Sequence, residues 1–161
     1  MEDLYAIAYK SKATRELTPQ DLDRLLLDAR AFNQGAGVTG VLLYHAGSFF
    51  QFFEGPDAGV EAVYERICQA RTHTDIVELL KAPSRSRQFE SWHMGFCEPP
   101  ETELQTLATA SWEDAMPITR VSYERSEGLG FLLHYWNKWK AEPHPNNSFK
   151  PNTHRGGNLP R

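Results

Sequence analysis

The chain has 161 residues, of which 40% are hydrophobic and 24% charged, and its formal net charge is −4. These values are typical of one globular domain with a short extension, and they give no electrostatic reason to bind nucleic acid or an anionic membrane. No apolar run has the length of a membrane span, and the first residues lack the basic start of a signal peptide. Cys68 and Cys97 have no CxxC spacing, so we expect a reduced cytoplasmic protein.

The first half of the chain alternates strand-like and helix-like segments. Residues 4–10 predict a β-strand with its aromatic side chains on one face. The sequence TPQD at residues 18–21 predicts a helix start, because threonine can cap it, proline suits the first position and aspartate suits the positive N-terminus. The apolar stripe of this helix leads to Asn33. Residues 38–45 and 48–54 predict a hairpin around a short Ala-Gly turn.

The following segments complete a β-α-β-β-α-β-β order. We expect Asp57 to cap a second helix and residues 76–82 to form a fourth strand. Residues 91–97 predict a fifth strand, with Trp92 and Met94 on one face. This order predicts a ferredoxin-like α+β sandwich.

Two further helices are predicted after the sandwich, at residues 101–110 and 127–141. The second carries its leucines, Trp136 and Trp139 along one side, which favours packing on the back of the sheet over a role as exposed interface anchors. The last residues are rich in proline, asparagine and glycine, which predicts a disordered tail. The predicted division is a domain at residues 1–97, a C-terminal helical extension at 98–142 and the tail at 143–161.

Three polar side chains fall on predicted apolar faces. Gln51 lies within FFQFFE, where strand alternation puts it on one face with phenylalanine side chains. Asn33 follows Leu22 by about three helical turns, and Tyr9 shares its strand face with apolar neighbours. Each residue alone has a structural explanation, such as an amide that bonds a strand edge or a helix end. Together they predict a polar edge inside an apolar pocket, which suits a flat heteroaromatic ligand.

Five short segments stand out by their order and spacing. They are YKSKA (9–13), ARAFN (29–33), VTGVL (38–42), FFQFFEGP (49–56) and WHMGF (92–96). No segment is specific alone. Together they resemble the BLUF family of flavin-binding blue-light sensor domains, from about Leu4 to Phe96.

The resemblance implies noncovalent binding of FAD, with FMN or riboflavin as alternatives in a heterologous host. It implies that light drives electron and proton transfer from Tyr9 through Gln51, which rearranges the hydrogen bonds to the flavin. Trp92 and Met94 match residues that shift near the flavin, and the sequence leaves open which of them is nearer in the dark. The implied cofactor-binding residues are Ser11, Arg30, Asn33, Gln51 and His73.

The chain departs from the family after the second helix. The family commonly has Asp-x-Arg-His there, whereas this chain has Ala70, Arg71, Thr72 and His73. Thr72 thus replaces the arginine that would bond the flavin, and Ala70 replaces the acid. Adjacent helical residues point about 100° apart, so Arg71 is not assumed to substitute. Flavin binding is still expected, with an affinity that the sequence leaves open.

Other classes of function have little support in the sequence. The histidines lack the HExxH or HxxxH spacing of a metal site, and the chain has no GxSxG, P-loop or GxGxxG motif. We therefore do not expect an enzyme such as a small hydrolase, and a flavin-independent interaction module is the alternative. The residues after Cys97 are too few for a cyclase or phosphodiesterase domain. The signal is expected to leave through the C-terminal helices, a homo-oligomer or an unidentified downstream protein.

Overall fold

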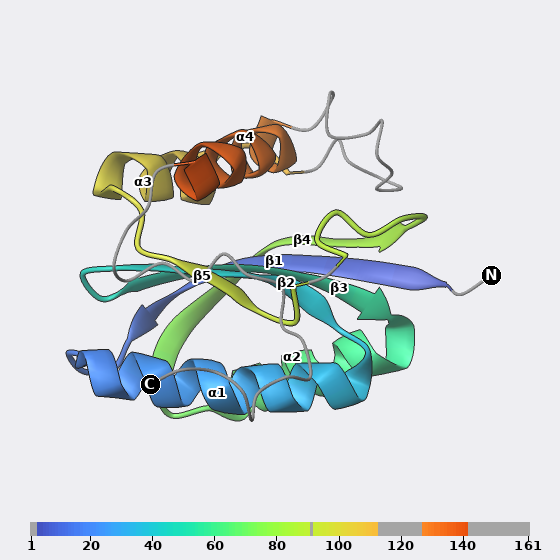
Figure 1. The fold of residues 1–161 in the computed structure, drawn as a ribbon, viewed down its shortest axis with the longest axis horizontal. Helices are drawn as coiled ribbons and strands as arrows, with labels where there is room; N and C mark the ends of the chain where they lie inside the picture. Colours follow the sequence, from blue (N-terminus) through green and yellow to red (C-terminus); the bar gives the residue numbers. More distant parts are fainter. Residues whose placement is uncertain (1–2, 91, 113–126, 142–161) are drawn as a thin grey trace.

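The computed structural model describes residues 3–90, 92–112 and 127–141, which fold into a layered α+β structure (Figure 1). In chain order the elements are β1 (Leu4–Ala13), α1 (Pro19–Ala36), β2 (Thr39–His45), β3 (Ser48–Pro56), α2 (Asp57–Gln69), β4 (His73–Ser84), β5 (Gly95–Cys97), α3 (Glu101–Thr109) and α4 (Glu127–Ala141).

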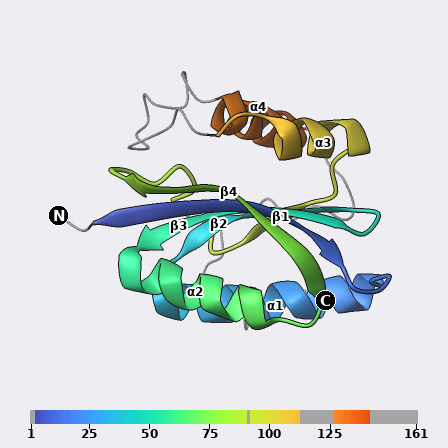
Figure 2. The ribbon, with the colours of Figure 1, turned by 180° about the vertical axis from the view of Figure 1, so that it is seen from behind.

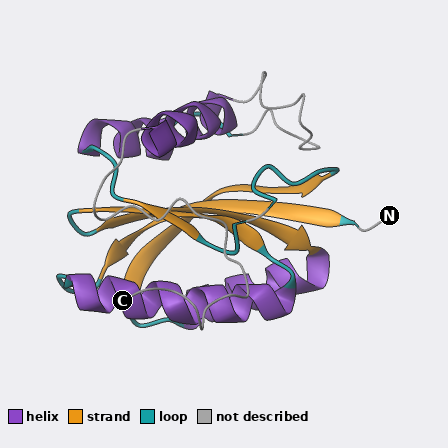
Figure 3. Ribbon diagram, in the orientation of Figure 1, coloured by secondary structure: helices purple, strands orange, loops and turns teal. Residues whose placement is uncertain are grey.

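A five-stranded sheet in the order β4-β1-β3-β2-β5 forms the middle layer. Helices α1 and α2 cover one face, named the front here, and α3 and α4 cover the other face, the back (Figures 1 and 2). Strands β1 to β4 pair antiparallel, and β5 joins β2 in parallel. Figure 3 shows the sheet between its two helical layers. This arrangement confirms the predicted ferredoxin-like α+β fold and the predicted order of its elements.

The start of α1 agrees with the prediction from TPQD. Thr18 is the N-cap, and its side chain accepts a hydrogen bond from the Asp21 backbone N–H at 3.1 Å. The Asp21 carboxylate accepts from the Thr18 N–H at 2.9 Å, which completes a capping box. Pro19 occupies the first turn, where its missing N–H costs nothing. These local bonds fix where α1 begins beside the end of β1.

The β2–β3 hairpin sets the register of the central strands. Its turn residues Ala46 and Gly47 both have positive φ, 46° and 88°, as tight hairpin turns require. Strand β3 continues antiparallel to β1, with Tyr9 directly opposite Gln51. Two of the three polar residues picked out in the sequence are thus neighbours across two central strands.

Two local predictions are wrong. Asp57 does not cap α2: Pro56 is the N-cap, no side chain caps the helix, and Asp57 already lies in its first turn. The reason is that β3 ends at Pro56 and α2 begins at the next residue, so Asp57 is already helical and Pro56 holds the capping position. The charge of Asp57 is still suited to the positive end of the helix.

The fifth strand is shorter than predicted and includes only Gly95–Cys97. Trp92 and Met94 precede it in irregular backbone, so strand alternation does not put them on one face. Met94 belongs to a front cluster with Leu26 and Phe96, whereas Trp92 packs against the back cluster. The predicted shared face of Trp92 and Met94 is therefore wrong.

The back of the sheet is an apolar and aromatic core. Its buried members include Phe50 and Phe52 from β3, Trp112, and Leu132 and Trp136 from α4. Trp139 is buried in the same cluster, which confirms that both α4 tryptophans pack on the sheet. Each large apolar side chain removed from water contributes roughly 1.5–3 kcal/mol, so this cluster firmly attaches α4 to the sheet.

The predicted disordered tail at residues 143–161 lies outside the described residues. Among the helices that the structure describes, none has the length and apolar character needed to cross a membrane.

A candidate ligand-binding cavity on the front of the sheet

A cavity of about 500 Å³ lies between the front of the sheet and helices α1 and α2. Tyr9, Asn33 and Gln51 all line it, and their exposed fractions are only 3%, 2% and 5%. Apolar side chains from both helices and the sheet form much of the remaining wall. Those walls include Leu25, Leu42, Phe49, Val63 and Ile67. The fold thus brings the three polar residues of the sequence pattern to one pocket, whose lining is partly apolar and partly polar.

Gln51 has a defined orientation between two side chains. Its Oε1 accepts a hydrogen bond from the Tyr9 hydroxyl, and its Nε2 donates to the Met94 sulfur at 3.4 Å. Burial, with smaller contributions from Cys68 and Tyr64, raises the pKa of Tyr9 well above the ordinary value of a phenol. Tyr9 is therefore a protonated donor at neutral pH. The amide oxygen faces this donor, and the amide nitrogen faces a weak thioether acceptor.

His73 joins the ends of three elements beside Tyr9. Its Nε2 lies 2.8 Å from the Ile67 carbonyl oxygen, which can only accept, so Nε2 carries the proton. Its Nδ1 lies 2.7 Å from Ser11 Oγ, which donates to it when the ring is neutral. The ring centroid is 5.9 Å from that of Tyr9. His73 lines the cavity, whereas Ser11 is buried behind it and does not.

Asn33 and Arg30 both reach the backbone that leads into β5. Asn33 Nδ2 donates to the His93 carbonyl at 2.8 Å, and Arg30 Nε donates to the Met94 carbonyl at 2.8 Å. Arg30 is half-buried, and desolvation lowers the pKa of its guanidinium, which a nearby carboxylate on α1 partly offsets. Of these two predicted cofactor-binding residues, only Asn33 lines the cavity.

Trp92 lies away from the cavity. Its ring packs edge-on against Trp136 of α4, with centroids 5.5 Å apart. Gly95 sits beneath the same Trp136 ring, so closely that an added Cβ would lie 2.8 Å from a ring atom. In this structure Met94, and not Trp92, contacts Gln51.

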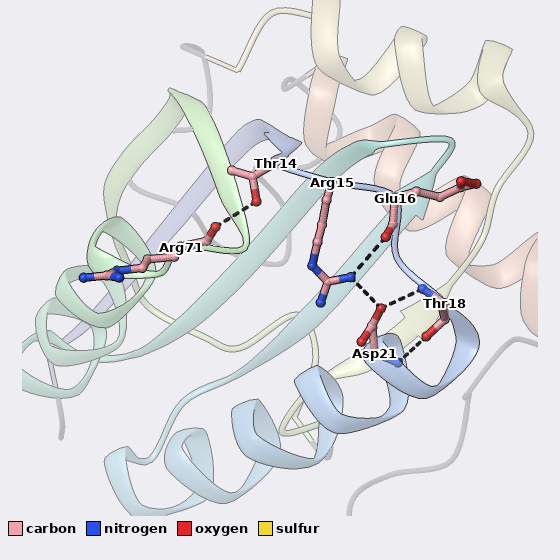
Figure 4. A network of polar contacts seen from close by, with 6 residues as sticks. All are labelled: Thr14, Arg15, Glu16, Thr18, Asp21 and Arg71. Atoms are coloured by element: carbon pink, nitrogen blue, oxygen red, sulfur yellow. Dashed lines mark hydrogen bonds and ion pairs between the residues drawn. The ribbon is translucent and has the colours of Figure 1, made fainter.

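A polar network joins residues at the start of α1 to the α2–β4 connection (Figure 4), and Arg15, Asp21 and Thr72 of this region line the cavity. The Thr14 N–H donates to the Thr72 carbonyl at 3.0 Å, and the Thr14 hydroxyl donates to the Arg71 carbonyl at 2.8 Å. Arg15 pairs with Asp21 at 2.8 Å, and hydrogen bonds from Arg15 and the helix start hold the pKa of Asp21 well below its ordinary value. The β1–α1 loop is thus tied both to the α2–β4 connection and to α1.

The departure from the family motif falls on the cavity wall. Ala70 and Thr72 line the cavity, while the Arg71 side chain extends away from Arg15 and Asp21 in Figure 4. This orientation agrees with the expectation that Arg71 does not substitute for the family arginine that Thr72 replaces.

Sequence reasoning missed three arginines that line the cavity: Arg15, Arg24 and Arg66. The guanidinium carbon of Arg66 lies 4.9 Å from the ring centroid of Phe32, so this side chain spans from α2 to α1. Arg24 borders the apolar stripe of α1, which is a weak sequence signal. Arg15 and Arg66 reach the cavity through contacts between different elements, which no local sequence pattern predicts.

The donor set fits a flavin. The cavity volume lies within the roughly 300–1,000 Å³ of small-molecule sites, and it combines apolar walls with a few polar groups. The Gln51 and Asn33 amides can bond the polar edge of a heteroaromatic ring. Both nitrogens of His73 are already bonded to Ile67 and Ser11, so its imidazole contributes a ring surface to the wall. Among the described residues, no group of three or more His, Cys, Asp or Glu side chains could hold a metal ion.

Comparison with known proteins gives the family. The sequence model described as "Sensors of blue-light using FAD" (BLUF) matches residues 4–95, more than half of the chain. This chain therefore belongs to the BLUF family of blue-light photoreceptors, whose cofactor is FAD. The match confirms the resemblance read from the five segments and the expectation of a light sensor rather than an enzyme domain.

Two curated relatives in this family are much longer than the chain. It is 36% identical over 131 residues to the photoactivated adenylate cyclase subunit alpha-like protein FB of Euglena gracilis, covering 74% of this chain and 13% of that protein. It is 34% identical over 86 residues to the blue light- and temperature-regulated antirepressor BluF of Escherichia coli (strain K12), covering 53% of this chain and 21% of BluF. The matched part is thus a small fraction of each relative.

Solved structures of similar size share the fold. The dark-state structure of the BLUF protein BlrB has a TM-score of 0.62 and 27% identity, covering 83% of this chain and 95% of BlrB. The photo-activated state of BlsA has a TM-score of 0.59 and 29% identity, covering 65% of this chain and 76% of that one.

Proposed function

We propose that Tyr9 and Gln51 are the photoactive pair of this photoreceptor, beside FAD held noncovalently between α1 and α2. The observation that carries this proposal is the buried hydrogen bond from the Tyr9 hydroxyl to Gln51 Oε1. A buried amide whose nitrogen has a thioether as its acceptor is a poor choice for stability alone. Such a weakly held amide suits a group that must exchange its hydrogen-bond partners.

The cavity residues have separate roles in holding the cofactor. Asn33 and Gln51 present donors and acceptors to the polar edge of the ring, and His73 contacts the ring together with the apolar walls. Ser11 acts through His73 by fixing the orientation of the imidazole. When bound, the flavin supplies blue-light absorption and an excited state that accepts an electron.

The switch uses the chemistry of an amide next to a phenol. Tyr9 would give up an electron and a proton, and the proton would pass through Gln51, the acceptor of its hydrogen bond. Gln51 would rearrange as the electron and the proton return to Tyr9, so that its donor and acceptor ends exchange surroundings. A carboxylate could not do this, because it offers acceptors only. Turning the amide takes its nitrogen away from the Met94 sulfur, which is a weaker acceptor than an oxygen.

The signal is proposed to leave through β5 and α4. Met94 contacts Gln51, and the next residue, Gly95, lies against Trp136 of α4. A shift of the chain at Met94 would therefore reach α4 directly. On this view residues 1–97 form the sensor domain and residues 98–142 the output extension, which acts on a homo-oligomer or a downstream protein.

The test removes the two switch groups separately. Gln51→Leu and Tyr9→Phe should each bind flavin and lose the reversible light-induced red shift of the absorption band. Cys68→Ala and Cys97→Ala are controls that should retain it, because neither thiol lines the cavity. Absorption spectra before and after blue light decide the question. A normal red shift in Gln51→Leu would refute this mechanism, and absence of flavin after reconstitution would refute the photoreceptor assignment.

A further inference from the structure

Three consecutive carbonyl groups before β5 each accept a hydrogen bond, one from the backbone of β2 and two from side chains of α1. The Gly40 N–H donates to the Trp92 carbonyl at 2.7 Å. Asn33 donates to the His93 carbonyl and Arg30 to the Met94 carbonyl, each at 2.8 Å. Residues 92–94 lie outside β5, so these bonds take the place of a strand ladder in setting the path of the segment.

The path of this segment decides what Gln51 contacts. Trp92 packs toward α4, while the Met94 side chain, 1% exposed, points to the front. Its sulfur is the acceptor for Gln51 Nε2. Any group that fixes the Met94 backbone therefore also fixes the contact that favours one orientation of the Gln51 amide.

We propose that Arg30 is a positioning residue of the switch: by binding the Met94 carbonyl it holds the Met94 sulfur against Gln51, and it thereby shortens the lifetime of the light-activated state. This inference rests on the proposed role of Gln51. It assigns Arg30 to the protein side of the switch instead of the cofactor, since Arg30 does not line the cavity.

Of the three donors, Arg30 is the one that a substitution can remove without altering the lining of the cavity. The Gly40 donor is a backbone N–H, which every residue except proline supplies. Asn33 lines the cavity, so its replacement also alters cofactor binding. Arg30 lies three residues before Asn33 and hence on the same side of α1. Its bond is charge-assisted, which makes it stronger than a neutral one.

The direction of the effect follows from the dark-state contact. Without the guanidinium, the Met94 carbonyl loses its side-chain donor and the sulfur is less well placed for Gln51 Nε2. The dark orientation of the amide is then less favoured, so the return from the lit state slows. We expect Arg30→Leu, which keeps an aliphatic stem, to lengthen the lit-state lifetime about tenfold, the effect of one hydrogen bond. Flavin affinity should change less than about twofold, because no cavity contact is lost.

The first measurement is thermal recovery of the dark spectrum after a blue-light pulse, for the full chain loaded with FAD. The dark spectrum of Arg30→Lys should recover at an intermediate rate, since lysine retains a cationic donor but has a shorter side chain. Arg71→Leu is the matched control, because the Arg71 side chain extends away from Arg15 and Asp21 and does not line the cavity. This control should recover like the parent.

The second measurement does not depend on photochemistry. The chain has three methionines, so ¹³C-methyl labelling gives few signals, and Met94→Leu identifies the one from Met94. In flavin-free protein, Arg30→Leu should shift or broaden the Met94 methyl signal, whereas Arg71→Leu should not. In a Met94→Leu background, Arg30→Leu should no longer change the recovery rate, because Arg30 acts through Met94.

Each outcome decides the inference. Parent-like recovery with an unchanged Met94 methyl signal would overturn it. A flavin affinity that is lowered more than about tenfold in Arg30→Leu would also overturn the inference, because Arg30 would then be a cofactor ligand. If Arg30→Leu does not fold, Arg30→Lys provides both measurements. If the parent binds flavin but shows no photocycle, the proposed function fails, while the methyl signal still decides whether Arg30 positions Met94.

Discussion

At Gln51 and the two residues that flank it, the two faces of β3 bury different kinds of side chain although they belong to one strand. On the back, Phe50 and Phe52 join a cluster of apolar and aromatic residues with Trp112 and α4. On the front, Gln51 lies between the same two phenylalanines in sequence, yet it bonds Tyr9 and Met94. Apolar side chains such as Phe53 pack on the front as well, so the difference lies in the hydrogen bonds of Gln51, which we propose are exchanged.

This difference separates stability from the proposed switching. Close packing on the back resists rearrangement, because a buried side chain there has no empty space into which it could move. Hydrogen bonds on the front have alternatives, because an amide carries a donor and an acceptor at one end. The two functions meet at residues 92–95, where Met94 faces the front and Gly95 touches Trp136 at the back.

The largest expected effect is on stability and comes from the back. Phe52 is fully buried, so Phe52→Ala should lower the free energy of unfolding by about 3–5 kcal/mol. Gln51→Leu, one residue earlier, should cost only about 1 kcal/mol, because the buried leucine offsets the unpaired Tyr9 hydroxyl. Urea unfolding of both variants measures the difference. Equal losses would show that the two faces do not divide their roles in this way.

A smaller effect is expected where the faces meet. Gly95→Ala would place a methyl group 2.8 Å from the Trp136 ring, so we expect a loss of about 1–3 kcal/mol. Trp136→Phe makes room for that methyl group, and the double variant should lose less than the sum of the two single ones. Urea unfolding checks this as well. Strict additivity would mean that the strand and α4 are not in tight contact at this point.

The smallest effect is expected from pH. Burial raises the pKa of Tyr9 above its ordinary value near 10, so the phenol stays protonated and the red shift should be constant from about pH 6 to 10. The folded state retains this proton longer than the unfolded chain does. The contribution of Tyr9 to stability is therefore complete below about pH 10 and falls as pH rises further, and Tyr9→Phe removes this loss. A red shift that titrates near pH 8 would contradict the burial of Tyr9.

The sequence by itself determined the features that depend on local periodicity. Strand alternation put Gln51 and Tyr9 on an inward face, and helical spacing put Asn33 on the buried side of α1. The capping box from Thr18 to Asp21 is likewise a contact within a few residues. Such features can be predicted because the repeat of the backbone fixes the direction of each side chain wherever the element lies.

Only the tertiary structure decided the path of residues 92–94. The sequence reads as a strand there, but the carbonyls bind Gly40, Asn33 and Arg30, from elements far away in the chain. That path puts Met94, and not Trp92, next to Gln51. The bond from Ser11 to His73 is long-range in the same sense. A local pattern cannot report these contacts, because donor and acceptor meet only once the sheet and both front helices have assembled.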